Sequence, residues 1–189
     1  MIKIEDNFIP IHNFSKLQEY CDNNLFEIVS YPDKQFSVLK TPEHIIDYLR
    51  IDNYEITLSF IRSAYKGFDN DIRIHSDNII NGYKTEMATV LYVNDESGVT
   101  NNGTAFWRHH KFGDVLPKDC SEEEFNDIIL NDSNDISKWK LRDFISSKPN
   151  RLLTYDANYF HSKFPNEIEE GIRKVVVTFY RKKNEQKGT

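Results

Sequence analysis

The spacing of apolar residues along the chain changes near residue 54. Before that point, residues 14–24 carry apolar side chains at helical spacing. Thr41-Pro42-Glu43 is typical of a helix start, with Thr41 as the N-cap and proline in the first turn of a helix that runs toward residue 50. From residue 54, apolar and polar residues alternate as far as residue 65, which predicts a half-buried strand. We therefore expect two helices ahead of a β-rich body.

Further short strands are predicted beyond this first one, and turns rich in Gly, Asn and Asp separate them. Such a series of short strands is typical of an antiparallel sandwich or barrel. The predicted strands cover residues 71–77, 87–94, 104–108, 151–155 and 173–181.

A helical insertion interrupts this series around residues 121–148. Ser121 and Glu124 form the pattern of a capping box, and Phe125, Ile128 and Ile129 give an apolar stripe behind it. The polar stretch that follows, residues 131–150, is expected to contain a second short helix packed by Trp139. The insertion could serve as a lid or as a substrate platform.

Composition and charge narrow the class of protein. A chain of 189 residues with 39% hydrophobic residues fits a single domain, here residues 1–189. The net charge of −6 gives the protein as a whole no attraction to nucleic acid or to anionic lipid. Two distant cysteines, a charged N-terminus and the absence of a long apolar run predict a cytoplasmic protein that is not inserted in a membrane.

The first candidate for chemistry is the pair His75 and Asp77. Residues two apart on a strand point to the same face and can share one metal ion. Two imidazoles and one carboxylate make the facial triad of non-heme iron oxygenases, and His161 is the best candidate for the missing imidazole. A histidine taken alone is more often an ordinary hydrogen-bonded residue, so the pair needs support from elsewhere in the chain.

Arg173 gives that support, because it opens the last predicted strand on an apolar face. It shares this face with Val175, Val177 and Phe179, where an unpaired guanidinium would be costly. A bound carboxylate would satisfy the guanidinium through two parallel hydrogen bonds. Lys174 is the alternative partner, if the register of the strand differs by one residue.

The order of these features resembles the Fe(II)/2-oxoglutarate-dependent dioxygenases, and the prolyl-hydroxylase-like branch in particular. The similarity covers about residues 54–181, and its more local motifs are similar to uncharacterised oxygenase-like proteins of bacteria and phages. The motifs that carry it are Tyr65 ten residues before the first ligand, His75-Ser76-Asp77, Tyr92-Val93-Asn94, Gly103-Thr104-Ala105-Phe106, Arg151-Leu152-Leu153 before His161, and the strand led by Arg173.

This resemblance implies a double-stranded β-helix, the jelly roll also found in cupins, with flanking helices. It implies that His75, Asp77 and His161 bind Fe(II) and that 2-oxoglutarate and O2 are cosubstrates. Arg173 and Tyr92 would hold the distal carboxylate of 2-oxoglutarate, with Tyr65 as a further contributor to that pocket. The implied reaction is hydroxylation of an unidentified substrate, with a peptide or amino-acid side chain favoured, and release of succinate and CO2.

Several alternatives stay open at this point. The chain could be a jelly-roll protein that binds metal without catalysis, or a cupin-like metalloenzyme that needs no cosubstrate. Asp77 favours a hydroxylase over the related halogenases, which have a small residue in place of this carboxylate. His109 and His110 follow the predicted strand 104–108, and adjacent residues of a strand point to opposite faces, so at most one of them could reach the metal. We expect both to be non-ligands. Trp107 and Trp139 are expected to be packing residues.

Overall fold

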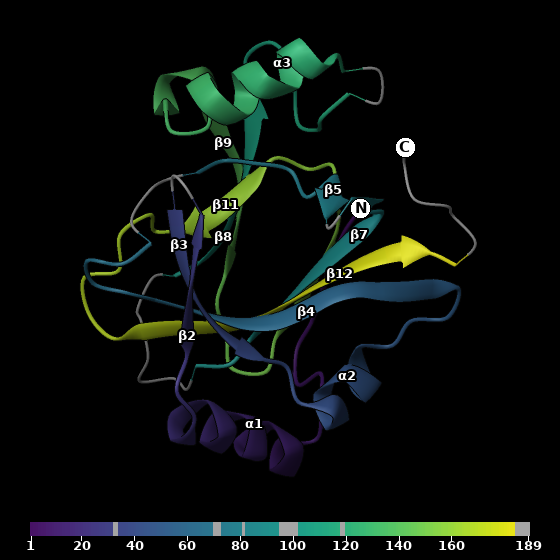
Figure 1. Cartoon of the computed structure of the whole chain (residues 1–189), viewed down its shortest axis with the longest axis vertical. Coiled ribbons are helices and arrows are strands. Elements are labelled where there is room, and N and C mark those ends of the chain that lie inside the picture. The colour runs from purple at the N-terminus through teal and green to yellow at the C-terminus, as the bar shows by residue number, and fades with distance from the viewer. Residues whose placement is uncertain (32–33, 70–72, 81, 95–101, 118–119, 184–189) are drawn as a thin grey trace.

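Two antiparallel sheets packed against each other form the body of the protein (Figure 1). The computed structural model describes residues 1–31, 34–69, 73–80, 82–94, 102–117 and 120–183. In the larger sheet the strand order is β1-β10-β7-β12-β4-β3-β2, and in the smaller one it is β11-β8-β9. The strands are β1 (Ile2–Glu5), β2 (Glu27–Tyr31), β3 (Lys34–Lys40), β4 (Tyr54–Tyr65), β7 (Met87–Tyr92), β8 (Gly103–His109), β9 (Trp139–Ser146), β10 (Leu152–Asp156), β11 (His161–Phe164) and β12 (Ile172–Lys182), with a separate hairpin of β5 (Ile79–Ile80) and β6 (Tyr83–Lys84).

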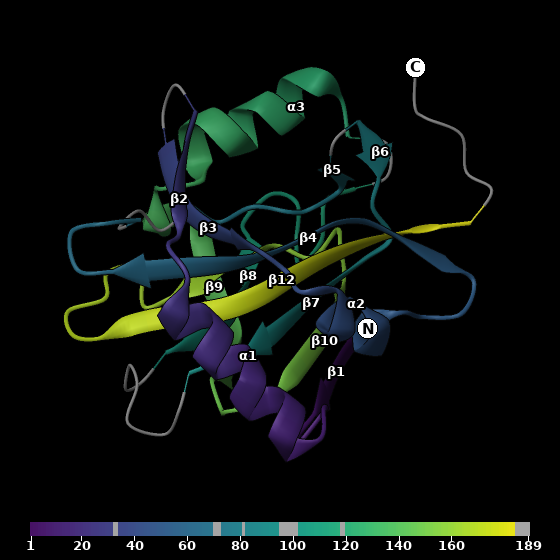
Figure 2. The same cartoon turned by 60° about the horizontal axis from the view of Figure 1, so that its bottom comes forward.

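The outer face of the larger sheet is covered by the two N-terminal helices, α1 (Ile11–Asn23) and α2 (Glu43–Leu49). Figure 2 shows α1 lying across this face. Leu17 and Cys21 of α1 and Ile45 of α2 join a buried cluster with Ile61 and Val176 of the sheet. Burying this apolar area stabilises the fold, and it ties residues 14–49 to the strands that form the predicted core.

The two sheets meet through a second buried cluster between their inner faces. Phe106 of the smaller sheet packs there with Tyr155, Val175 and Phe179 of the larger one. The central pair, β4 and β12, runs antiparallel over almost its whole length, with an irregularity between Phe179 and Tyr180. This long pair fixes which residues of β4 and β12 face the interior.

The insertion begins as predicted and then departs from the prediction. Ser121 caps α3 (Glu122–Asp127), and both hydrogen bonds of the capping box are present. The chain continues as a turn of π-helix, η1 (Ile128–Asp132), and a short 3-10 turn, η2 (Ile136–Lys138). The second helix predicted within residues 131–150 is wrong, because residues 139–146 form β9, which pairs with β8. Figure 1 shows α3 at the end of the molecule opposite α1 and α2.

Two other local predictions need correction. Of the strand predicted over residues 71–77, residues 71 and 72 lie outside the described residues, while residues 73–77 form no regular strand, and His75 makes an isolated β-bridge to His161. Thr41 does not cap α2, whose N-cap is Pro42, since the Thr41 hydroxyl lies 3.0 Å from that of Ser59.

None of the helices in the described residues could cross a bilayer, because the longest, α1, has 13 residues and about 20 are needed.

Candidate metal centre

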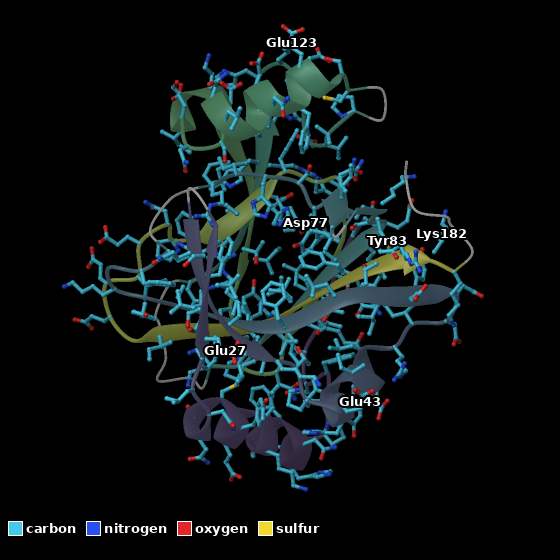
Figure 3. The ribbon with its side chains drawn as sticks, viewed as in Figure 1. Glu27, Glu43, Asp77, Tyr83, Glu123 and Lys182 are labelled. Carbon is cyan, nitrogen blue, oxygen red and sulfur yellow. The ribbon has the colours of Figure 1, made fainter. Side chains whose placement is uncertain are left out.

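His75, Asp77 and His161 meet in the interior, between the two sheets. His75 and His161 exchange backbone hydrogen bonds of 3.0 and 2.9 Å, and the Asp77 amide donates to the carbonyl of Ala157 at 2.8 Å. These bonds fix the segment that precedes β5 against the connection between β10 and β11. Figure 3 shows Asp77 inside the molecule. Two neighbouring residues and a third that lies 84 residues beyond Asp77 are thus held together by backbone contacts, before any side chain binds a ligand.

The three side chains present their ligand atoms to one another. His75 Nε2 lies 3.4 Å from Asp77 Oδ1, and His161 Nε2 lies 3.2 Å from Asp77 Oδ2. One ligand atom from each residue lies within 4.8 Å of the other two. Among the described residues this is the only group of three or more potential ligand residues this close together. The arrangement fits one divalent cation with two imidazole ligands and one carboxylate ligand.

Both imidazoles are oriented through their second ring nitrogen. His75 Nδ1 lies 2.8 Å from the carbonyl of Arg73, and His161 Nδ1 lies 2.9 Å from that of Tyr159. A carbonyl only accepts, so each Nδ1 donates its proton and each Nε2 keeps its lone pair when the ring is neutral. This is the tautomer that binds a metal through Nε2.

The charges at the centre also suit a cation. Burial acts to raise the pKa of Asp77, but the neighbouring His161 and His75 outweigh it and hold this pKa below its usual range. Burial acts to lower the pKa of His161, and the charge of Asp77 outweighs it, so that this pKa is raised. The carboxylate therefore stays ionised in the interior and needs a positive partner there.

Tyr155, which the sequence analysis did not select, completes the centre. Its hydroxyl lies 3.2 Å from Asp77 Oδ2 and 3.0 Å from His161 Nε2. Burial, followed by the charge of Asp77, raises the pKa of this phenol well above its ordinary value. Tyr155 is therefore a neutral hydrogen-bond donor to the centre. The strand predicted at residues 151–155 contained it, but no residue pattern marked its hydroxyl.

A cavity of about 80 Å³ adjoins the three ligands, and Arg173 lies in its wall. Arg173 is 4% exposed, and Val175, Val177 and Phe179 line the same cavity, as predicted for one face of the last strand. Its Nη2 donates to the carbonyl of Gly103 at 3.2 Å, while its buried Nε has no hydrogen-bond partner among the described residues. Burial lowers the pKa of this guanidinium. A buried guanidinium with an unused donor can bind a carboxylate.

The other residues that were predicted to contribute to this pocket do not line the cavity. Tyr92 is buried with its ring 5.7 Å from Arg173 Cζ, but its hydroxyl bonds to Thr104 at 2.8 Å and it does not itself line the cavity. Tyr65 is not a lining residue either: it stacks on Phe68 with 5.0 Å between ring centroids. Lys174 points away from the cavity and pairs with Asp22 of α1.

The remaining candidate histidines and the two tryptophans do not line the cavity beside the three ligands. His109 is buried away from the three ligands, with Nε2 3.1 Å from Asp132, and His110 is exposed. Neither is among the three residues whose ligand atoms meet. Trp107 and Trp139 are both buried and pack in the cluster beneath α3, which confirms their packing role.

No family model matches the sequence, and no curated protein matches it either. Solved structures match its fold over almost the whole chain. They include the non-heme alpha-ketoglutarate-dependent carbocyclase SnoK from nogalamycin biosynthesis, with 11% identity, a TM-score of 0.64 and coverage of 95% of this chain and 78% of that one.

Two further matches have TM-scores of 0.59 and 0.55. HygX from Streptomyces hygroscopicus, solved with nickel, 2-oxoglutarate and hygromycin B, is 10% identical, and the match covers 100% of this chain and 85% of HygX. A prolyl-4-hydroxylase from Pseudomonas putida is 12% identical, with 97% and 93% covered. At these identities the likeness establishes the fold. The prediction of a mainly β jelly roll with flanking helices is confirmed.

Proposed function

We propose that this protein is an Fe(II)- and 2-oxoglutarate-dependent dioxygenase that hydroxylates its substrate and releases succinate and CO2. The observation that carries this proposal is that His75, Asp77, His161 and Arg173 all line one small cavity between the sheets. A metal site alone would fit several kinds of metalloprotein. A buried guanidinium with an unused donor beside that site adds the need for a carboxylate.

The residues present fit both groups. His75, Asp77 and His161 would hold the iron through the two Nε2 atoms and the carboxylate, and Tyr155 would orient Asp77 by donating to Oδ2. Bound iron with 2-oxoglutarate supplies the oxidising chemistry, in which the cosubstrate loses CO2 and O2 is activated. Arg173 would bind the distal carboxylate of 2-oxoglutarate, and Thr104, which also lines the cavity, would lie beside it.

Other chain residues would shape the pocket. Tyr92 would support it indirectly, because its hydroxyl fixes that of Thr104. Val175, Val177 and Phe179 would exclude water from the reaction. Resemblance to prolyl hydroxylases makes a peptide or an amino-acid side chain the favoured substrate, although one fold serves many substrates.

Anaerobic titration with Fe(II) and then 2-oxoglutarate tests the proposal. We expect a weak visible charge-transfer band that is absent in His75→Ala, and formation of succinate when air is admitted. In Arg173→Gln we expect metal binding to persist and the affinity for 2-oxoglutarate to fall about 10- to 100-fold, because charge-assisted hydrogen bonds are lost. The exposed Arg108→Gln is the matched control, since this side chain pairs with Asp114 outside the cavity.

The alternatives predict other results. Absence of the band together with absence of succinate would refute the proposal. A metal-dependent rise in melting temperature without succinate formation would point instead to a metal-binding protein without catalysis. Activity that survives Arg173→Gln unchanged would indicate a metalloenzyme that needs no cosubstrate.

A further inference from the structure

Arg62 is a second guanidinium in the wall of the cavity, and it lies on the opposite side of β12 from Tyr92. In the strand order β7-β12-β4-β3, Tyr92 ends β7, while Arg62 is on β4 and pairs with Val175 of β12 and with Val38 of β3. Its side chain is 20% exposed, whereas Arg173 is almost fully buried. Arg62 therefore lies at a more exposed part of the cavity wall than Arg173.

The contacts of Arg62 leave part of its hydrogen-bonding capacity unused. Its Nη2 is paired with Asp69, and its Cζ lies 4.5 Å from the centre of the Phe36 ring. Its Nε is buried and has no hydrogen-bond partner among the described residues. Asp69 is itself shared, since Arg73 Nη1 lies 3.7 Å from its other oxygen. Asp69 thus lies beside two guanidinium groups, and the Nε of Arg62 remains an unused donor.

The side chains that line the cavity include more basic than acidic groups. Its described wall contains Arg62, Lys163 and Arg173 but only one carboxylate, Asp77. Asp69 pairs with Arg62 from outside the lining and offsets one of these cations. A divalent metal ion and the dianion 2-oxoglutarate cancel each other, so the surplus of positive side chains is reduced but not reversed in the loaded site. This surplus stands out in a protein whose net charge is −6. A positive cavity in an acidic protein attracts anionic ligands and repels cationic ones.

We propose that Arg62 recognises an anionic group, a carboxylate or a phosphate, on the substrate that is oxidised. Asp69 and Phe36 hold the guanidinium at the mouth of the cavity until the substrate anion binds to it. The inference rests on the proposed function, because it assigns Arg173 to 2-oxoglutarate and leaves Arg62 for the substrate. It restricts the substrate to molecules or side chains that carry a negative charge.

Calorimetric titration of the protein, loaded with zinc and 2-oxoglutarate, tests this assignment. The probes are inorganic phosphate and acetate, with neutral acetamide as the control. We expect saturable binding of at least one anion and no binding of acetamide, and the stronger anion identifies the group on the substrate. The binding should be lost in Arg62→Gln and unchanged in Arg108→Gln, an arginine that also pairs with an aspartate but lies outside the cavity.

Asp69→Asn distinguishes a binding role from a purely structural one. If Asp69 competes with the substrate anion for Arg62, its removal should strengthen anion binding by about threefold to fivefold, the scale of one partly exposed ion pair. Arg62→Gln leaves the buried carboxylate of Asp69 without its guanidinium and could therefore destabilise the fold. The double variant Arg62→Gln/Asp69→Asn removes both charges and avoids this unpaired carboxylate. Its melting temperature verifies that the fold is retained.

Three results would overturn the inference. They are no binding of either anion to the wild type, equal binding to the double variant, and weaker or unchanged binding to Asp69→Asn. A loss of 2-oxoglutarate affinity in Arg62→Gln would also overturn it, since Arg62 would then belong to the cosubstrate pocket. The heat of 2-oxoglutarate binding, measured beforehand on the zinc protein, reports separately on the proposed function.

Discussion

At the scale of single residues, the metal centre depends on groups that orient its ligands as much as on the ligands. Each imidazole is fixed by a backbone carbonyl, and Asp77 by the hydroxyl of Tyr155. The carbonyls come from Arg73 and Tyr159, each two residues before the histidine that it orients. No substitution of a side chain removes a carbonyl, so Tyr155 is the partner that mutation can test.

Tyr155→Phe should weaken metal binding by about 10- to 100-fold while leaving the fold intact, because it removes one hydrogen bond that orients a ligand. Competition with a chromophoric chelator measures the affinity. Tyr180→Phe is the control, a buried tyrosine whose hydroxyl donates to the carbonyl of Leu49 at 2.9 Å. Equal metal affinities in Tyr155→Phe and the wild type would exclude Tyr155 from the centre.

At the scale of elements, the smaller sheet depends on a glycine where β8 meets β9. A Cβ added at Gly103 would lie 2.1 Å from the carbonyl oxygen of Ile145, a backbone atom that cannot turn aside. The carbonyl of Gly103 also accepts the hydrogen bond from Arg173. The close approach of the two strands therefore affects the position of the guanidinium that we assign to 2-oxoglutarate.

Gly103→Ala should lower the free energy of unfolding by about 1–3 kcal/mol, the usual cost of overpacking, and should also weaken 2-oxoglutarate binding. Chemical denaturation and ligand titration measure the two effects. Gly113→Ala is the contrasting variant: nothing lies within 4 Å of its added Cβ, but its φ of +79° disfavours alanine. It should cost about 1 kcal/mol and leave 2-oxoglutarate affinity unchanged. Weaker 2-oxoglutarate binding in both variants would contradict the proposed role of Gly103.

At the scale of the whole molecule, the N-terminal helices and the strands share one core. Cys21 of α1 is buried in the cluster that includes Leu91 of β7 and Val176 of β12. Tyr180 of β12 bonds to the carbonyl of Leu49, the last residue of α2. We accordingly propose that residues 1–189 fold as one domain, which should unfold in a single cooperative transition.

The stability of the protein should fall in alkaline solution, because this shared core buries a thiol and a phenol that ionise at high pH. Burial raises the pKa of the Cys21 thiol from 9.0 to about 11 and that of Tyr180 from 10.0 to about 12. The folded state favours both neutral forms, so their contribution is complete below about pH 9 and is lost as the pH rises toward 12. Each of these pKa shifts corresponds to about 2–3 kcal/mol in the free energy of unfolding. Denaturation curves at several pH values measure the loss, and Tyr180→Phe should reduce it; an unchanged slope would contradict this assignment.

The sequence by itself determined the parts that follow from local rules. Alternation defined β4 and β12, helical spacing defined α1, and a capping box started α3, since these patterns act through neighbours within a few residues. The order of His75, Asp77, His161 and Arg173 indicated the chemistry, and all four line one cavity. Alternation along β4 also puts Tyr65 on the face opposite Arg62, which explains why it does not reach that cavity.

Only the tertiary structure decided what depends on partners distant in the chain. Residues 139–146 became a strand because β8 offers them backbone partners, and that edge leaves Leu141 and Phe144 partly exposed, so no clean pattern marked them. Tyr155 approaches Asp77 across 78 residues of sequence, and Arg62 reaches the cavity through the pairing of β4 with β12. Hydrogen bonds and burial between remote segments are properties of the packed chain, and they bring a row of candidate ligands together around the one cavity for which we propose two places for anions.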